Sequence, residues 1–268
     1  MENLLDISVI LPIKNMKMKD FEDFFQKAVE SVTTQEFLPK NLIIVYGEDK
    51  NLSDYLKKYD FKGLETTFVE FKDEPNFANQ VNLGVSKAET KWVSILEVDD
   101  EYSKIWFKNV KTYMEVYNTV DAFLPLVVDV DNKLVFQGFT NEATFAANFS
   151  QEMGYLTNET LLQYQNFQTS GMVFKKSLVD DFGGFKPSIK LTFVYEFLLR
   201  LTYNSAKILT IPKIGYKHIN LREDSIFWEY KNGSSILKED EVKFWVSSAK
   251  KEYFFTDDRN IKYVSENA

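Results

Sequence analysis

The sequence predicts an α/β fold with a mostly parallel central sheet flanked by helices. Two patterns predict it: short runs rich in β-branched residues alternate with amphipathic segments, and one such run ends abruptly in several carboxylates. The order β-α-β-α-β-α-β is typical of parallel strands joined by right-handed crossovers. With 268 residues, 44% of them hydrophobic, the chain is long enough to bury a large core within one domain.

The strands and helices of the first half follow in a regular order. The run 7–11, closed by Pro12, is typical of a buried parallel strand. Asp20 can cap the next segment, in which apolar residues recur every three or four positions over 21–32. The other elements expected here are strands at 42–46, 66–71 and 92–96, a polar turn at 47–51 and a helix at 79–88.

After residue 101 the pattern is looser. The elements expected there are helices at 105–117, 159–165, 193–203 and 242–255, a hairpin of 122–130 with 133–136, a strand at 171–174, and a short helix ending at Gly183 and Gly184. No internal repeat or low-complexity linker interrupts the chain. We therefore expect one domain made of two functional halves.

Composition excludes several classes of protein. The net charge of -8 argues against a nucleic-acid partner, because binding to the phosphate backbone of a nucleic acid needs a broad basic face. The absence of cysteine excludes disulfides, thiolate zinc sites and cysteine nucleophiles, and it fits a reducing compartment. No run approaches the ~18 apolar residues that span a bilayer. The sequence therefore predicts a cytoplasmic protein without a transmembrane segment.

The most informative segment is 92–101, which reads WVSILEVDDE. A buried strand here carries four carboxylates to its own C-terminal end: Glu97, Asp99, Asp100 and Glu101. In an α/β sheet, ligands gather outside the carboxyl ends of the strands. Carboxylate oxygens suit Mg²⁺ or Mn²⁺, which in turn bind diphosphates. The alternative is an exposed acidic turn with no ligand.

The order of several motifs resembles that of the inverting, family 2 type of glycosyltransferase with the GT-A fold. ISVILPIKN at 7–15 is similar to the opening strand of the family, which ends in Pro-x-x-Asn, and AVESVTTQ at 28–35 is similar to its "ALESVLNQ" helix end. LIIVYGED at 42–49 falls where the family writes "IIVVDDGS", and NLG at 82–84 with KWVSILEVDD at 91–100 resembles "N-x-G…GEYIxFLDxDD". The later motifs of the family also have counterparts in the same order: GMVFKK at 171–176, FGGF at 182–185 and EFLLR at 196–200. The resemblance covers roughly residues 7–222 and depends on order and spacing.

This resemblance implies a metal-dependent enzyme that moves a sugar from a nucleotide sugar, with UDP as the best guess for the nucleotide, to an acceptor hydroxyl with inversion. It divides the chain into a nucleotide-sugar-binding half at 1–101, an acceptor-binding and catalytic half at 102–235, and a C-terminal helical segment at 236–268. The expected partners are a nucleotide-sugar donor and a glycan or other hydroxyl-bearing acceptor.

The resemblance also assigns the metal ligands. In the family the final acidic residue of the D-x-D motif binds the metal, so Asp99 is the first expected ligand. Glu97 replaces the usual first Asp of the motif and is expected at the nucleotide sugar, in contact with the metal directly or through water. His218, which is the only histidine, is a second expected ligand for Mn²⁺ or Mg²⁺. The alternative for a lone histidine is a structural role.

Five further residues are expected at the nucleotide sugar. Glu48 stands where the family uses an Asp to accept a hydrogen bond from uracil, although a solvated turn residue is an equal alternative. Pro12 and Asn15 are expected to shape the pocket through the backbone, and Asn82 belongs to the motif beside it. Arg222 can pair with phosphate oxygens through its planar guanidinium.

One position departs from the family. Val194 stands where the family carries the Asp that deprotonates the acceptor, and valine cannot take a proton. Glu196 is a candidate base, although its spacing to Arg200 also suits an ordinary helical ion pair. Asp224 and the neighbouring Glu223 are rivals. The other reading is a non-catalytic protein that binds nucleotide sugars or glycans on a decayed GT-A scaffold.

Overall fold

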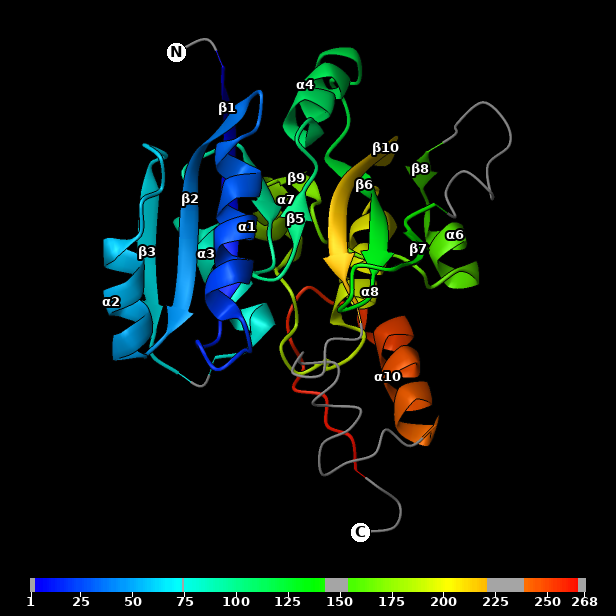
Figure 1. Ribbon diagram of the computed structural model, residues 1–268. Coiled ribbons are helices and arrows are strands. Elements are labelled where there is room, and N and C mark those ends of the chain that lie inside the picture. Colours follow the sequence, from blue (N-terminus) through cyan, green and yellow to red (C-terminus); the bar gives the residue numbers. More distant parts are fainter. Residues whose placement is uncertain (1–2, 74, 143–153, 221–238, 265–268) are drawn as a thin grey trace.

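The computed structural model describes residues 3–73, 75–142, 154–220 and 239–264, and these form one ten-stranded sheet with helices on both faces (Figure 1). The strands are β1 (Leu4–Ile13), β2 (Leu38–Gly47), β3 (Thr66–Phe71), β4 (Trp92–Ile95), β5 (Glu101–Tyr102), β6 (Ala122–Val130), β7 (Phe136–Thr140), β8 (Tyr155–Leu156), β9 (Val173–Lys175) and β10 (Ile208–Ile219). The helices are α1 (Phe21–Thr33), α2 (Lys50–Lys58), α3 (Phe77–Lys87), α4 (Trp106–Val116), α6 (Asn158–Gln163), α7 (Ser177–Phe182), α8 (Phe193–Tyr203) and α10 (Glu239–Glu252).

The sheet has the order β3-β2-β1-β4-β9-β6-β10-β5, with β7 paired to β6 and β8 paired to β10. The first four strands are parallel, and β6 and β10 are parallel to each other. Between these groups, β9 runs antiparallel to both β4 and β6. The α/β prediction is confirmed, and the sheet is mixed because β5, β7, β8 and β9 run antiparallel to their partners. Because β4 and β6 are both antiparallel to β9, they run in the same direction, and the carboxyl ends of β1, β2, β4, β6 and β10 lie at the same edge.

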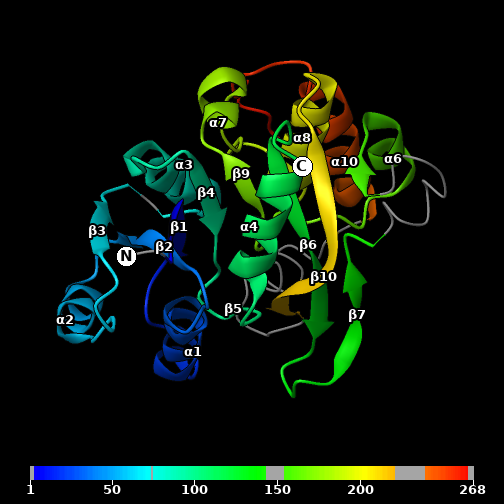
Figure 2. The same cartoon turned by 90° about the horizontal axis from the view of Figure 1, so that it is seen from above.

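Both faces of the sheet are covered, which explains why residues 9–13 of β1 and 42–46 of β2 are apolar without interruption. Alternate residues of β1 point to opposite faces: Val9 and Leu11 pack with α1 and α4, whereas Ile10 packs with α3 and α8. Figure 2 shows α1 and α3 on opposite sides of β1 and β2. Packing against α3 is close, because a Cβ at Gly84 would lie 2.4 Å from Ile10.

Two local predictions in the first half are wrong. β1 continues beyond Pro12 to Ile13, because β4 pairs only with residues 7–10 and so needs no N–H from Pro12. The expected polar turn at 47–51 instead leads into α2 at Lys50. The Asp49 side chain caps this helix by accepting hydrogen bonds from the backbone N–H groups of Asn51 and Leu52.

The second half contains strands that the pattern did not predict. β10 has twelve residues, but exposed Pro212 and Lys213 interrupt its apolar run, and β5 and β8 have two residues each. β7 begins at Phe136, so the predicted hairpin exists with its second strand later than expected. α8 has the predicted bounds, and α10 starts three residues earlier than expected. In the described part of the chain, no helix is long and apolar enough to cross a membrane.

Candidate active site

The acidic end of β4 meets the end of β10 at the carboxyl edge of the sheet. Glu97, Asp100 and His218 each offer a ligand atom, and these atoms lie within 4.8 Å of one another. Residue 101 begins β5, which pairs with Tyr216 and Lys217 of β10 and so brings the acidic segment alongside that strand. The site is therefore assembled from two strands that are distant in the sequence.

Asp100 is fully buried and uses both carboxylate oxygens. Oδ1 accepts a hydrogen bond from the backbone N–H of Ile219 at 2.9 Å, and Oδ2 lies 3.0 Å from Nδ1 of His218. Burial is the largest single influence on His218 and opposes a charge on the imidazole, but the carboxylates of Asp100, Glu97 and Asp99 together outweigh it and raise the pKa of His218 to about 10. The protonated imidazole therefore offsets the negative charge of the surrounding carboxylates, and a cation that bound Nε2 would take the place of the proton there.

Glu97 is half-buried and held at two points. Its Oε1 accepts a hydrogen bond from Ser170 Oγ at 2.9 Å, and its backbone N–H donates to Tyr216 Oη at 2.9 Å. Burial, then the negative charge of Asp100, raises the pKa of Glu97 to about 7. Gly171 lets Tyr216 reach this position, because a Cβ there would lie 2.5 Å from the tyrosine ring.

The donor set of the cluster fits a divalent cation. Carboxylate oxygens with an imidazole nitrogen suit Mn²⁺ better than Mg²⁺. Both oxygens of Asp100 already have hydrogen-bonding partners, so Asp100 is better placed to orient His218 than to bind the cation itself. The ring nitrogen of His218 that Asp100 does not contact is Nε2. Asp99, the expected first ligand, is half-buried but is not a member of the three-residue cluster. Sequence reasoning did not single out Asp100, although it belongs to the same acidic run.

The residues expected at the nucleotide lie in different settings. Pro12 is buried in β1, Asn15 accepts a hydrogen bond from the backbone N–H of Lys17, and Glu48 is exposed directly after β2. Asn82 bonds the backbone of Phe185 in both directions, donating at 2.8 Å and accepting at 2.9 Å. This pairing fastens α3 to the loop before α8 and argues against a nucleotide contact by Asn82. Arg222, Asp224 and Glu223 lie outside the described residues.

Glu196, the candidate base, is buried within an ion triad. Its Oε1 lies 3.0 Å from Lys186 Nζ and 2.9 Å from Arg200 Nε, and its Oε2 accepts from Arg200 at 3.0 Å. Glu196 is 0% exposed, so an acceptor hydroxyl cannot reach it. This geometry argues against Glu196 as the base. Val194, at the position of the family base, packs against the hydrophobic core.

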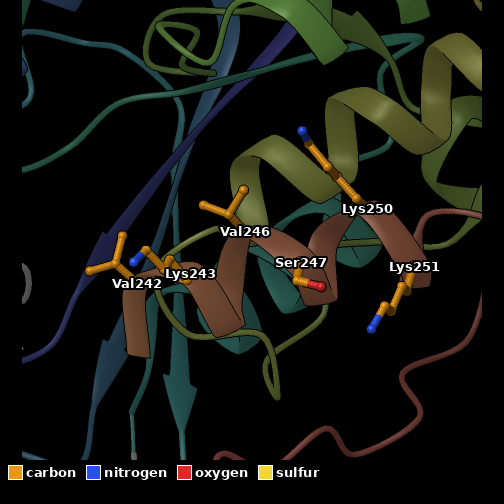
Figure 3. Close-up of a pocket in the computed structure, with 6 residues that line it drawn as sticks. All are labelled: Val242, Lys243, Val246, Ser247, Lys250 and Lys251. Carbon is orange, nitrogen blue, oxygen red and sulfur yellow. The ribbon is translucent and has the colours of Figure 1, made fainter. Parts of the chain in front are cut away.

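A surface hollow lies on α10, and no residue of the acidic cluster lines it. Figure 3 shows the six residues that line it, all from this one helix: Val242, Lys243, Val246, Ser247, Lys250 and Lys251. None of the residues expected at the site lies among them. The open, lysine-lined face of one helix does not resemble an enclosed donor pocket.

The fold resembles crystal structures of S. aureus TarS. TarS 1-349 aligns with 17% identity and a TM-score of 0.63, covering 80% of this chain and 60% of that chain. The same fragment in complex with UDP aligns with 18% identity and a TM-score of 0.63, covering 93% and 72%. Its complex with UDP-GlcNAc aligns with 18% identity and a TM-score of 0.61, covering 80% and 58%. In the first of these comparisons the chain therefore spans less than two thirds of the TarS fragment, and identities this low show the shared fold alone.

The sequence itself gives the family. A search of curated proteins found no match. Residues 8–182, well over half of the chain, match the family model described as Glycosyl transferase family 2. Together with the resemblance of its α/β fold to that of TarS, this match shows that the chain belongs to glycosyl transferase family 2 and has the GT-A fold.

Proposed function

We propose that this protein is a metal-dependent glycosyltransferase that moves a sugar from a UDP-sugar to an acceptor hydroxyl with inversion at the anomeric carbon. The observation that carries the proposal is the cluster of Glu97, Asp100 and His218 at the carboxyl edge of a family 2 sheet. UDP is supported by the TarS structures, which were solved with UDP and with UDP-GlcNAc. The absence of cysteine supports a cytoplasmic location.

Four residues would form the cation site. Asp99 and His218 would be direct ligands, Asp100 would fix the ring of His218, and Glu97 would contribute directly or through water. A bound Mn²⁺ or Mg²⁺ would neutralise the negative charge that develops on the leaving diphosphate. The protein itself would supply proximity, because it holds donor and acceptor in line for attack.

The nucleoside would bind at the ends of β1 and β2. These strands are adjacent and parallel, so Asn15 and Glu48 follow them at the same edge of the sheet. Glu48 is exposed there, and its carboxylate can accept the N3–H of uracil. Arg222 would pair with the diphosphate through two parallel hydrogen bonds. The acceptor would be a glycan or another molecule that presents a hydroxyl group.

A second candidate function is supported by the position of the family base. Val194 cannot take a proton, and Glu196 is enclosed by two cations. A protein that binds nucleotide sugars without transferring the sugar would retain the cation site and tolerate both features. The two candidates differ in one observable, the release of UDP from a bound donor.

Calorimetry with UDP, in the presence and absence of Mn²⁺, tests binding, and UDP release from a panel of UDP-sugars tests turnover. Asp99→Asn is expected to abolish the part of UDP binding that depends on Mn²⁺. The matched control is Asp60→Asn, which removes an exposed carboxylate that pairs with Lys62. If UDP binds no more tightly with Mn²⁺ than without it, metal dependence is excluded. If UDP binds with Mn²⁺ but no donor is turned over, the binding function replaces the transferase.

A further inference from the structure

Asp129 lies beside His218 on the neighbouring strand. β6 and β10 are parallel, and the two residues are direct partners in their register. Partners in this register project their side chains to the same face of the sheet. Tyr216 shares that face, because it lies two residues before His218, and its hydroxyl reaches the backbone of Glu97. Asp129 therefore points to the face on which the acidic cluster is built.

The carboxylate of Asp129 is fixed on one side only. The residue is 8% exposed, and its Oδ2 accepts a hydrogen bond from Thr140 Oγ1 at 2.6 Å. Within the part of the chain that the structure describes, Asp129 has no other hydrogen-bonding or ionic partner, and its Oδ1 is not one of the fully buried polar atoms without a partner. Oδ1 is therefore accessible at the surface, and the hydrogen bond from Thr140 to Oδ2 fixes the orientation of the carboxylate.

Four other carboxylates of the sheet edge and of α8 are engaged differently. Asp100 uses both oxygens, Glu196 is enclosed between two cations, and Glu101 forms an ion pair with a lysine of β10. Glu97 is held by a serine and belongs to the expected cation site. Asp129 combines near-complete burial, a fixed side chain and one accessible oxygen on the strand next to His218.

We propose that Asp129 is the base that Val194 cannot be, and that it accepts the proton of the attacking hydroxyl. This inference rests on the proposed transferase function. In the step, the O–H bond of the acceptor breaks and its proton passes to Oδ1 of Asp129, while the oxygen forms a bond to the anomeric carbon. The bond from that carbon to the diphosphate breaks, and its electron pair leaves with UDP. Asp129 then returns the proton to solvent.

The test measures UDP release from UDP-GlcNAc and other UDP-sugars with Mn²⁺, with water as the acceptor, beside calorimetric binding of UDP. Asp129→Asn is expected to lower kcat by about 100-fold or more, the usual share of a general base, and to leave UDP affinity unchanged. The matched control is Asp121→Asn, which removes a partly buried carboxylate, bonded to Lys175, at the opposite end of β6. This control is expected to retain the kcat of the unmodified protein.

Asp129→Ala with added formate separates chemistry from structure. Formate supplies a carboxylate to the vacated space, so it is expected to restore part of the kcat, and it is not expected to stimulate the unmodified protein. Melting temperature identifies a variant that has lost its fold. If Asp129→Asn keeps its kcat, or if folded Asp129→Ala gains nothing from formate, the assignment is overturned.

The inference and the proposed function fail in different ways. A protein that binds UDP but releases none from any donor excludes both the transferase and its base. A protein that turns over a donor equally well with Asp129→Asn remains a transferase and loses only the assigned base.

Discussion

The carboxylate of Asp100 lies 3.0 Å from Nδ1 of His218, although the two residues are 118 positions apart in the chain. Their contact joins the acidic end of β4 to the last residues of β10. A buried carboxylate that binds one ring nitrogen fixes the orientation of the imidazole and leaves the other nitrogen for a cation. The contact between Asp100 and His218 therefore places the acidic segment 97–101 in the candidate cation site.

Asp100→Asn is expected to weaken Mn²⁺-dependent binding of UDP by about 10- to 100-fold, the usual effect of losing the carboxylate behind a ligating histidine. The expected reason is loss of the charge that orients His218. Titration calorimetry with UDP at fixed Mn²⁺ measures the effect. Asp60→Asn is the control. Equal affinity for the variant and the unmodified protein would show that His218 needs no such support.

Glu196→Gln is expected to lower the free energy of unfolding by about 3–5 kcal/mol, because Lys186 and Arg200 would remain buried without their shared anion. Urea denaturation measures the loss. The control is Glu115→Gln, which breaks an exposed pair with Lys111 and is expected to cost no more than about 0.5 kcal/mol. A Glu196→Gln protein of normal stability without turnover would instead identify Glu196 as the base.

Gly171→Ala is expected to destabilise the protein by about 1–3 kcal/mol and to weaken Mn²⁺-dependent UDP binding, because the new Cβ overlaps the ring of Tyr216. Gly171 also has a φ of +72°, which strains any side chain. Gly63→Ala is the matched control, since Gly63 has a φ of +80° and a Cβ there would meet nothing within 4 Å. Denaturation and calorimetry on both variants separate the clash from the backbone strain.

If the two alanine variants lose the same stability and both bind UDP normally, the contact between Gly171 and Tyr216 has no influence on the site. A loss of UDP binding in Gly171→Ala alone supports the view that Tyr216 positions the backbone of Glu97.

The stability of the protein is expected to fall at alkaline pH through Tyr195. Burial, then the nearby Tyr253, raises the pKa of Tyr195 from 10.0 to about 12, and its hydroxyl donates to the carbonyl of Leu161 at 2.8 Å. The folded state favours the neutral phenol. This contribution is therefore complete below the unfolded pKa of 10.0 and is lost as pH rises towards about 12.

Urea denaturation between pH 9 and pH 12 checks the sign. Tyr195→Phe is expected to cost about 1 kcal/mol at neutral pH, through loss of one hydrogen bond, and to flatten the alkaline decline. A decline of the same slope in the phenylalanine variant would assign it to other tyrosines.

Local pattern was sufficient for most elements of the first half of the fold, although it predicted a turn where α2 begins. Short-range hydrophobic pattern was enough to predict β1, β2, β3, β4 and α1. The four strands are short runs rich in apolar residues, and α1 has an apolar stripe with helical spacing. β10 was missed because exposed Pro212 and Lys213 interrupt it, and β5 was missed because two residues carry no period. Pairing in the sheet, and not propensity, makes these segments strands.

The site was predictable in part for the same reason. The acidic run and His218 were recognisable by residue type and by the order of family motifs. The roles of Asp100 and Asn82 depend on hydrogen-bonding partners about a hundred positions away, at Ile219 and at Phe185. No spacing within the sequence reports such contacts. The pairing of Glu196 with Arg200 follows from their helical spacing, whereas the complete burial of Glu196 and its contact with Lys186 do not.

The sequence by itself determined the α/β class, the family, and a strand that ends in carboxylates, because these follow from residue type, short-range period and motif order. Only the tertiary structure decided that Asp100 would face His218, that Asp129 would share their face of the sheet, and that Glu196 would be enclosed. The physical reason is that the order of strands across the sheet sets the first two relationships, and the packing of α8 into the core sets the third. Both are properties of the whole packed core.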